Sequence, residues 1–382
     1  MTIFDTVPLD QLRRRTSAKW RAYPPDVLPL FVAEMDVPQA EPVVRALHDA
    51  VRTGDTGYPH GRELAEALAE FAARRWGWQP DAGASRLASD VMVGLVEALR
   101  LVTDPGDAVV INPPVYPPFR AFVEHAGRAV VTAPLGPDGR LDLEVLDRAF
   151  ARARAHGARP AFLLCHPHNP TGTLHTAAEL RAVGELAARH GVRVVADEIH
   201  APLVPGAGRF VPTTTQIPDA LALHSASKAF NLAGLRAAVI VPGPEAVADL
   251  ARLPWVVGDG VMHLGVLAAS VAYRECGSFL DEVLHGLAEN QLLLARLLAE
   301  HLPDVGWSPP EATYLAWLDL RAVPAVRAGA DPAGLLLDRG RVALMSGPTF
   351  GAEGAGFARL NLAASTSTLT QAVDRMARAL AD

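Results

Sequence analysis

The chain has 382 residues, of which 50% are apolar and 20% charged, and its formal net charge is −7. This composition is typical of a soluble globular protein long enough for two domains, and it excludes a disordered chain. The acidic balance gives no electrostatic basis for binding nucleic acid or an anionic membrane. No apolar stretch approaches the roughly 18 residues of a membrane span. We therefore expect a cytoplasmic protein without nucleic-acid or membrane partners.

The N-terminal part of the chain predicts two helices behind a polar, Pro-rich segment, residues 1–40. Apolar residues at helical spacing predict a helix over 41–53, and a second helix is expected over 62–76. Between them lies G-D-T-G-Y-P-H-G, residues 54–61, whose glycines and proline break the helical pattern.

From residue 107 to 241, short apolar runs alternate with helical patterns. This rhythm is typical of a mostly parallel sheet that is covered by helices on both faces. The expected strands are 108–111, 129–133, 161–165, 192–196, 220–223 and 237–241.

The C-terminal part has a different character and indicates a smaller α+β domain. It contains a predicted helix over 291–302, a strand over 314–320 and a final helix from Thr368. We therefore predict an α/β fold with a large domain over 49–275. Residues 1–48 and 276–382 are expected to form the small domain together. The two cysteines, Cys165 and Cys276, lie outside any CxxC pattern, which argues against a disulfide scaffold or a structural metal site.

Lysine is almost absent, because only Lys19 and Lys228 occur among the 35 basic residues. Arginine carries ion pairs at least as well as lysine, but its guanidinium cannot form an imine with an aldehyde. Lys228 lies in S-A-S-K, directly after the apolar run at 220–223. Its position favours an imine-forming lysine, and an ordinary surface lysine is the alternative.

Polar side chains follow three of the predicted strands, where ligands bind in open α/β sheets. The segments are H-P-H-N-P-T-G-T at 166–173, D-E-I-H at 197–200 and H-S-A-S-K at 224–228. Pyridoxal 5′-phosphate (PLP) needs an imine-forming lysine, a carboxylate for its pyridine nitrogen, a donor to its phenolate oxygen, and hydroxyl groups for its phosphate. Residues of these kinds are Lys228, Asp197, Asn169, Ser225 and Ser227.

Each of these residues also has a structural interpretation. Asp197 is a possible helix N-cap, and Asn169 lies in N-P-T-G, which forms a turn whatever its function. Ser225 and Ser227 alternate along an extended segment and are equally compatible with exposure to solvent.

Taken together, the motifs resemble fold-type I PLP-dependent enzymes, the aspartate-aminotransferase superfamily, over nearly the whole chain. Within this superfamily the chain resembles the C–S lyase branch, the cystathionine β-lyases of the MalY/PatB type. The motifs that carry this likeness are L-P-L-F-V-A-E-M-D (28–36), G-Y-P (57–59), N-P-P-V-Y-P-P-F (112–119), C-H-P-H-N-P-T-G (165–172), D-E-I-H, A-T-Y-L-A-W-L-D (312–319) and G-A-G-F-A-R-L-N (354–361).

The resemblance implies a role for each matching residue. Lys228 would bind the cofactor aldehyde and shuttle the proton, and Asp197 would pair with the pyridinium. Asn169 would meet the phenolate oxygen, and Tyr116 would stack on the ring. The phosphate would be held by the residues Val91, Met92, Ser225 and Ser227.

The resemblance also implies a homodimer with shared active sites. Tyr58 would reach the phosphate of the neighbouring subunit, while Arg359 and Asn169 would hold the carboxylate of an amino-acid substrate. Arg359 is also compatible with an ordinary surface ion pair.

Three positions, Asp90, Arg236 and Phe31, depart from the pattern of the lyase branch, whereas His200 follows it. Asp90 stands where relatives place Gly or Ser in the phosphate-binding turn, and Phe31 replaces the usual Trp. Arg236 matches the phosphate-binding arginine of aminotransferases, whereas His200 matches the lyase branch.

We therefore expect a C–S β-lyase that cleaves cystathionine-like S-substituted cysteines to pyruvate, ammonia and a thiol. An aminotransferase is the main alternative. A non-enzymatic sensor is a minor alternative, because no helix-turn-helix pattern precedes residue 28.

Overall fold

The computed structural model describes residues 1–327 and 329–381, and these form two compact units. The large unit comprises residues 39–168 and 173–277, and the small unit comprises 1–38, 169–172 and the chain from 278. The whole of α3 (Glu41–Thr53) belongs to the large unit, whereas the sequence placed its first part, up to residue 48, in the small domain. Packing of α3 against α12 (His263–Glu275) accounts for this difference.

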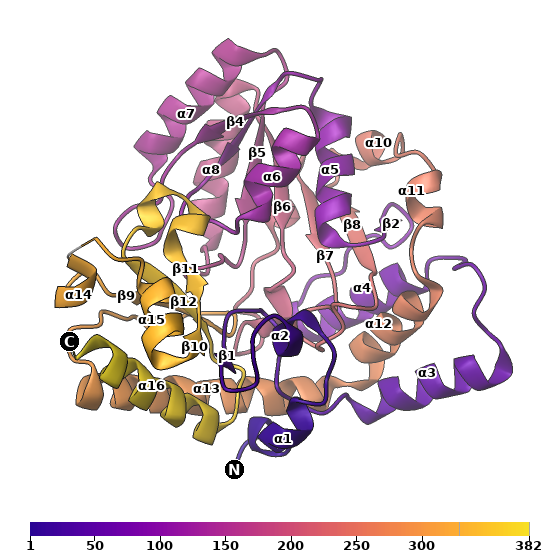
Figure 1. Cartoon of the computed structure of the whole chain (residues 1–382). Coiled ribbons are helices and arrows are strands. Elements are labelled where there is room, and N and C mark those ends of the chain that lie inside the picture. Colours follow the sequence, from indigo (N-terminus) through magenta and orange to yellow (C-terminus); the bar gives the residue numbers. More distant parts are fainter. Residues whose placement is uncertain (328, 382) are drawn as a thin grey trace. The chain divides into compact units, whose positions relative to one another are not determined.

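The large unit is built on a seven-stranded sheet in the order β2-β8-β7-β6-β5-β3-β4 (Figure 1). β3 to β7 run parallel, and β8 is antiparallel to both β7 and β2. The sheet is therefore mostly parallel, as predicted. The strands are β2 (Arg86–Ala88), β3 (Ala108–Ile111), β4 (Ala129–Thr132), β5 (Ala161–Cys165), β6 (Arg193–Asp197), β7 (Leu221–His224) and β8 (Ala238–Pro242).

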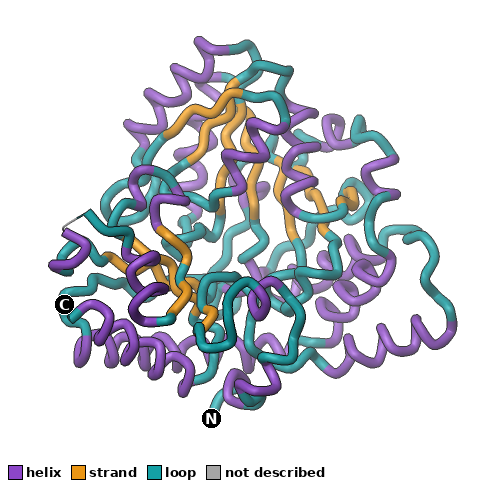
Figure 2. Tube along the Cα trace, viewed as in Figure 1, coloured by secondary structure: helices purple, strands orange, loops and turns teal. Residues whose placement is uncertain are grey.

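Helices cover both faces of this sheet, which explains why its central strands are apolar without a break (Figure 2). On one face Val109 and Ile111 pack with α5 (Val91–Val102) and α6 (Pro118–His125). On the other face Ala108 and Val110 pack with α7 (Leu143–His156) and α8 (Ala177–His190). Successive residues of β3 thus point into different halves of the core. The shorter helices are η2 (Ala201–Leu203), α9 (Thr213–Gln216), α10 (Val247–Leu250) and α11 (Val256–Asp259).

Two predicted helices of the large unit form and have the predicted last residues, and α4 (Glu63–Trp76) begins one residue later than predicted. α3 stops at Gly54 and α4 stops at Gly77, and both glycines adopt the left-handed conformation that ends a helix. α4 packs against α12, whose Gly265 lies against the backbone of Leu235.

The small unit contains a three-stranded antiparallel sheet, β11-β12-β9, and a short parallel pair, β1-β10. The N-terminal strand β1 thereby pairs with a strand more than 300 residues later in the chain, Leu28 opposite Val342. The strands are β1 (Leu28–Pro29), β9 (Leu315–Asp319), β10 (Val342–Ala343), β11 (Met345–Ser346) and β12 (Phe357–Asn361). The helices are η1 (Ile3–Asp5), α1 (Leu9–Leu12), α2 (Ala18–Arg21), α13 (Gly277–His301), α14 (Pro324–Arg327), α15 (Pro332–Gly340), η3 (Gly347–Phe350), η4 (Ala352–Gly354) and α16 (Thr366–Leu380).

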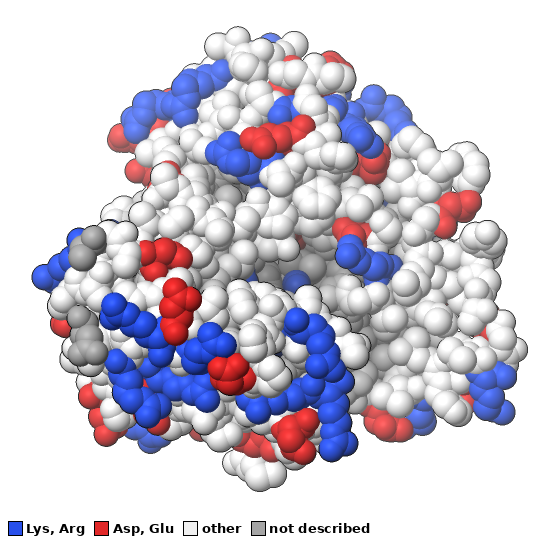
Figure 3. Space-filling view, viewed as in Figure 1, with Lys and Arg blue, Asp and Glu red and all other residues white. Residues whose placement is uncertain are grey.

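The surface of the small unit has a concentration of basic side chains (Figure 3). Four arginines line a pocket of 360 Å³ together with Asp26, which accepts two hydrogen bonds from one of them, Arg341. Among the residues that the structure describes, no helix is long and apolar enough to cross a bilayer. Cys165 and Cys276 are buried, free thiols.

Candidate functional site

The carboxyl ends of β6 and β7 lie next to each other and carry the predicted lysine and carboxylate. Asp197 ends β6 and pairs in parallel register with Leu223, so β7 continues past it into the turn that holds Lys228. Backbone hydrogen bonds hold this edge together, because the Glu198 N–H donates to the Leu223 carbonyl at 2.9 Å. The turn itself is closed by Phe230 N–H donating to the Ala226 carbonyl at 3.0 Å.

Asp197 is a buried carboxylate, with 5% of its surface exposed. Burial raises its pKa to about 6, although the Ile199 N–H, which donates to Oδ1 at 3.1 Å, and the nearby Lys228 ammonium oppose the shift. A carboxylate in such surroundings is stabilised by a cationic partner. A protonated pyridine nitrogen is a partner of this kind, so Asp197 fits the role that a PLP cofactor requires.

Ser225 and Ser227 form a hydroxyl pair directly before Lys228. Their Oγ atoms are 2.8 Å apart, and the Ser227 N–H donates to the Ser225 Oγ at 3.2 Å. Ser225 also donates to the Ala237 carbonyl at 2.7 Å. Because that bond uses the hydroxyl hydrogen of Ser225, Ser227 is the donor in the hydroxyl pair, and its hydroxyl would have to turn away from Ser225 to donate to a phosphate.

The start of α5 provides further donors for an anion. Asp90 caps the helix by accepting from the Val93 N–H at 2.8 Å. The N–H groups of Val91 and Met92 have no partner in the described part of the chain. Free amides at the first turn of a helix of this length suit a phosphate group. The amides, the serine hydroxyls and Arg236, whose Nη1 donates to Asp90 Oδ2, are all groups that bind phosphate.

The structure places the remaining predicted residues of the large unit in three different settings. Tyr116 is half-buried between β3 and α6, with its ring 6.2 Å from that of Phe119 in an edge-to-face arrangement. His200 is buried at the start of η2. Tyr58 lies in the loop between α3 and α4, and its side chain is 88% exposed to solvent.

The small unit brings together the two residues predicted to hold a substrate carboxylate. Arg359 lies on β12, is 97% buried, and donates from Nη1 to the Asn169 Oδ1 at 3.0 Å. Its Nη2 donates to the Phe31 carbonyl at 2.9 Å, and its guanidinium lies 5.1 Å from the centre of the Phe350 ring. The guanidinium is therefore held in a fixed orientation by three different groups.

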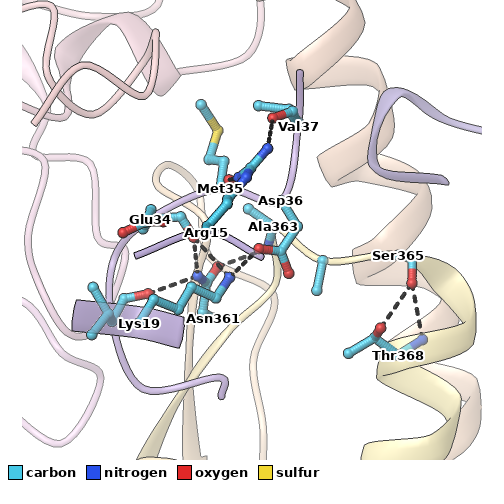
Figure 4. Close-up of polar contacts among 12 residues, drawn as sticks. Arg15, Lys19, Glu34, Met35, Asp36, Val37, Asn361, Ala363, Ser365 and Thr368 are labelled. Carbon is cyan, nitrogen blue, oxygen red and sulfur yellow. Dashed lines mark hydrogen bonds and ion pairs between the residues drawn. The ribbon is translucent and has the colours of Figure 1, made fainter. Parts of the chain in front are cut away.

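The other lysine has a structural role that the sequence did not predict. Lys19 is fully buried, with its Nζ 2.6 Å from Asp36 Oδ1 and 3.0 Å from the Glu34 carbonyl (Figure 4). Asn361 donates to the Val32 and Glu34 carbonyls at 2.8 and 2.7 Å. These contacts fix the segment 31–36 whose Phe31 carbonyl meets Arg359. The scarcity of lysine was the one sequence signal for this residue.

A second buried pair lies behind the carboxylate of the large unit. His224 Nε2 is 3.0 Å from Glu198 Oε2, and both side chains are almost completely buried. Burial opposes ionisation of Glu198, but His224 and the Thr213 N–H, which donates at 2.7 Å, hold its pKa below its usual value. Glu198 and His224 are sequence neighbours of Asp197 and Ser225, and nothing in the local sequence pattern marks them as partners.

Comparison with known proteins shows which family the chain is similar to. The family model for class I and II aminotransferases matches residues 25–376. A Mycobacterium tuberculosis protein provisionally named cystathionine beta-lyase is 52% identical over 98% of each chain. The cystathionine beta-lyase of Corynebacterium glutamicum is 36% identical over 97% of this chain and 99% of its own. A crystal structure from Corynebacterium diphtheriae, provisionally described as a PLP-dependent beta-cystathionase, superposes with a TM-score of 0.91 and 33% identity over all of both chains.

The chain belongs to the class I and II aminotransferase family and has its aspartate-aminotransferase-like fold. Relatives within this family that are more than 30% identical include proteins named cystathionine beta-lyase, and the cofactor of the chain is PLP. The resemblance predicted from the motifs is thereby confirmed.

Proposed function

We propose that this protein is a PLP-dependent C–S β-lyase that cleaves cystathionine-like S-substituted L-cysteines to pyruvate, ammonia and a thiol. The observation that carries the proposal is the similarity, over almost the full length, to proteins named cystathionine beta-lyase. When bound, PLP supplies an electron sink that makes the proton on the substrate Cα removable. The residues of the chain then decide which atoms are held and where the proton goes.

Lys228 would bind the cofactor aldehyde and, once freed by the substrate amine, would take the Cα proton on its Nζ. The electron pair left at Cα would break the C–S bond at Cβ, and the sulfur would leave as a thiolate that takes up a proton to give the thiol. Hydrolysis of the remaining three-carbon unit would give pyruvate and ammonia. Asp197 would hold the pyridine nitrogen in its protonated form, and the burial of this carboxylate supports the role.

The substrate is held by its carboxylate. Arg359 presents a planar guanidinium suited to bidentate binding of a carboxylate, and Asn169 is already hydrogen-bonded to it. Tyr116 would stack on the cofactor ring, and His200 lies close to Asp197 in the chain. The phosphate would be held by the Val91 and Met92 amides with Ser225, Ser227 and Arg236.

The protein acts as a homodimer with Tyr58 completing the site of the neighbouring subunit. Support comes from large apolar side chains of the large unit that are exposed to solvent. They lie in or beside the helices α3, α11 and α12. They include Val51, Tyr58, Trp255, Val256 and Met262, with Trp255 75% exposed. Exposed aromatic and Met side chains in this number are typical of a surface that is buried by a partner.

The test is to incubate the purified protein with cystathionine and assay pyruvate, thiol and the state of the cofactor. The expected result is catalytic pyruvate and thiol with the cofactor still an aldehyde, and borohydride should attach it to Lys228. Lys228→Arg keeps the positive charge but should lower turnover by several orders of magnitude, since a guanidinium cannot carry out the chemistry. Cofactor recovered on Lys19 would contradict the assignment.

Transamination is the second candidate, favoured by Arg236 and by the family model itself. In that reaction Lys228 would return the proton to the cofactor, and hydrolysis would release a keto acid and leave the amino group on the cofactor. Pyridoxamine phosphate would then accumulate with a stoichiometric amount of keto acid, and rapid turnover would require a second keto acid. That outcome would replace the lyase assignment.

A further inference from the structure

The two unusual residues of the phosphate-binding region are partners of each other. Asp90 and Arg236 each depart from the pattern of the C–S lyases, and in the structure Arg236 Nη1 donates to Asp90 Oδ2. The other carboxylate oxygen of Asp90 caps α5 through the Val93 N–H at 2.8 Å. One carboxylate therefore links the guanidinium to the first turn of the helix.

The backbone of the sheet places these two residues opposite each other. β2 and β8 are antiparallel, with Ala88 paired with Ala238. Asp90 lies two residues beyond Ala88, and Arg236 lies two residues before Ala238, so the same register continued brings them together. Their contact follows from strand pairing and does not depend on one side-chain rotamer alone.

The segment that carries Arg236 is held on two further sides. The adjacent Ala237 carbonyl accepts from Ser225, which lies in the turn that contains Lys228. On the α12 side, a Cβ atom added to Gly265 would lie 1.9 Å from the Leu235 carbonyl oxygen. The backbone at Arg236 is thus fixed relative to the serine hydroxyls and to the free amides of Val91 and Met92.

The exposure of the Asp90–Arg236 ion pair indicates a role in ligand binding and not in the stability of the fold. The side chain of Arg236 is 61% exposed and that of Asp90 20% exposed, and an ion pair this exposed contributes little to stability. A phosphate dianion at the first turn of α5 would meet an unpaired carboxylate if Arg236 were absent. The carboxylate and the phosphate are both negative and repel each other. The loss of PLP affinity on removing Arg236 should therefore depend on whether Asp90 is present.

We propose that Asp90 is a positioning residue that holds Arg236 beside the start of α5, and that the two residues act as one unit in retaining the cofactor phosphate. The proposal rests on the proposed phosphate site and goes beyond it by naming the group that orients the arginine. It predicts that the effects of changing the two residues on cofactor affinity are not additive.

The experiment is a double-mutant cycle on cofactor binding. The purified wild type, Asp90→Asn, Arg236→Gln and the double variant are stripped of cofactor and titrated with PLP. Asparagine keeps the cap on α5 and removes the charge. We expect Arg236→Gln to weaken binding by about 100-fold, because a charged hydrogen bond is lost and a carboxylate is exposed to the phosphate. The double variant should be only about 10-fold weaker than wild type. Asp90→Asn alone should change affinity by less than about threefold, because the loss of the contact that positions Arg236 is offset by the removal of a charge that repels the phosphate.

Pyridoxal, which lacks the phosphate, is the matched control ligand. None of the three variants should change its affinity, and all four proteins should have the same thermal midpoint without cofactor. An equal effect of Asp90→Asn in the presence and absence of Arg236 would overturn the proposal, as would a comparable loss of pyridoxal binding in Arg236→Gln. The readout is independent of the reaction catalysed, so a failure of the lyase assignment would leave these affinities unaltered.

Discussion

Single buried ionisable residues set the pH response of this protein. Burial raises the pKa of Asp197 from its ordinary value of 3.8 to about 6 in the folded, cofactor-free chain. A raised pKa means that the folded state favours the protonated form. Its contribution to stability is therefore complete below the unfolded pKa and is lost as the pH rises through 6.

We predict that the cofactor-free wild type loses about 3 kcal/mol of stability relative to Asp197→Asn between pH 4 and pH 7, since each pKa unit corresponds to about 1.4 kcal/mol. Urea unfolding of both proteins across this range measures the difference. Added PLP should abolish it in the wild type, because the pyridinium compensates the carboxylate. Parallel pH profiles for the two cofactor-free proteins would show that Asp197 ionises normally.

Lys19 illustrates the cost of a buried charge without its partner. Burial raises the pKa of Asp36, and Lys19 is its closest cation at 2.6 Å. Lys19→Met should lower the free energy of unfolding by about 3–5 kcal/mol, because it leaves an uncompensated carboxylate in the small unit. Lys19→Met combined with Asp36→Leu should recover most of this loss. Chemical denaturation of the two variants measures their free energies of unfolding. If the single and the double variant lost the same stability, packing and not charge would be responsible.

At the scale of elements, α12 closely approaches the segment before β8 that carries Arg236, a residue of the proposed phosphate site. Any side chain at Gly265 would collide with the Leu235 carbonyl, 1.9 Å from the added Cβ. Gly265→Ala should therefore destabilise the fold by about 1–3 kcal/mol and weaken PLP binding as the Arg236 segment is displaced.

Gly258→Ala, in α11, is the matched control, because an added Cβ there meets nothing within 4 Å. Denaturation and cofactor titration of both variants provide the comparison. If Gly265→Ala lost stability but kept full cofactor affinity, the segment would be able to move without disturbing the phosphate site.

Elements built from local patterns agree closely with their predicted ranges. β3 and β5 have the predicted ends, and β6, β7 and β8 are each displaced by one residue toward the C-terminus. The long helix α13 begins at Gly277, well before the predicted start at 291.

At the scale of the whole molecule, the prediction concerns assembly. Tyr58 is 88% exposed in one subunit, which suits a residue that acts on its neighbour. Mixing inactive Tyr58→Phe with inactive Lys228→Ala subunits should restore up to a quarter of wild-type activity if the subunits exchange freely, since half of the dimers are mixed and each carries one intact site. Activity is measured after exchange has been verified by size and labelling. No recovery despite exchange would mean that each site is complete within one subunit.

The sequence by itself determined the chemistry and the class of fold. Apolar runs of strand length report local burial, and an imine requires a lysine, so the sheet and the role proposed for Lys228 both follow from features contained in short segments. Asn169 was placed in a motif, but its bond to Arg359, 190 residues away, required the folded chain.

Only the tertiary structure decided which charges neutralise one another. Asp90 and Arg236 are 146 residues apart and read as two separate departures from the family pattern until the β2–β8 register joins them. Lys19 and Asp36 are likewise brought together only by burial, and the β6–β7 pairing brings His224 close to Glu198. Coulomb energy depends on separation and on exclusion of water, and neither quantity is encoded in the neighbourhood of a residue along the chain.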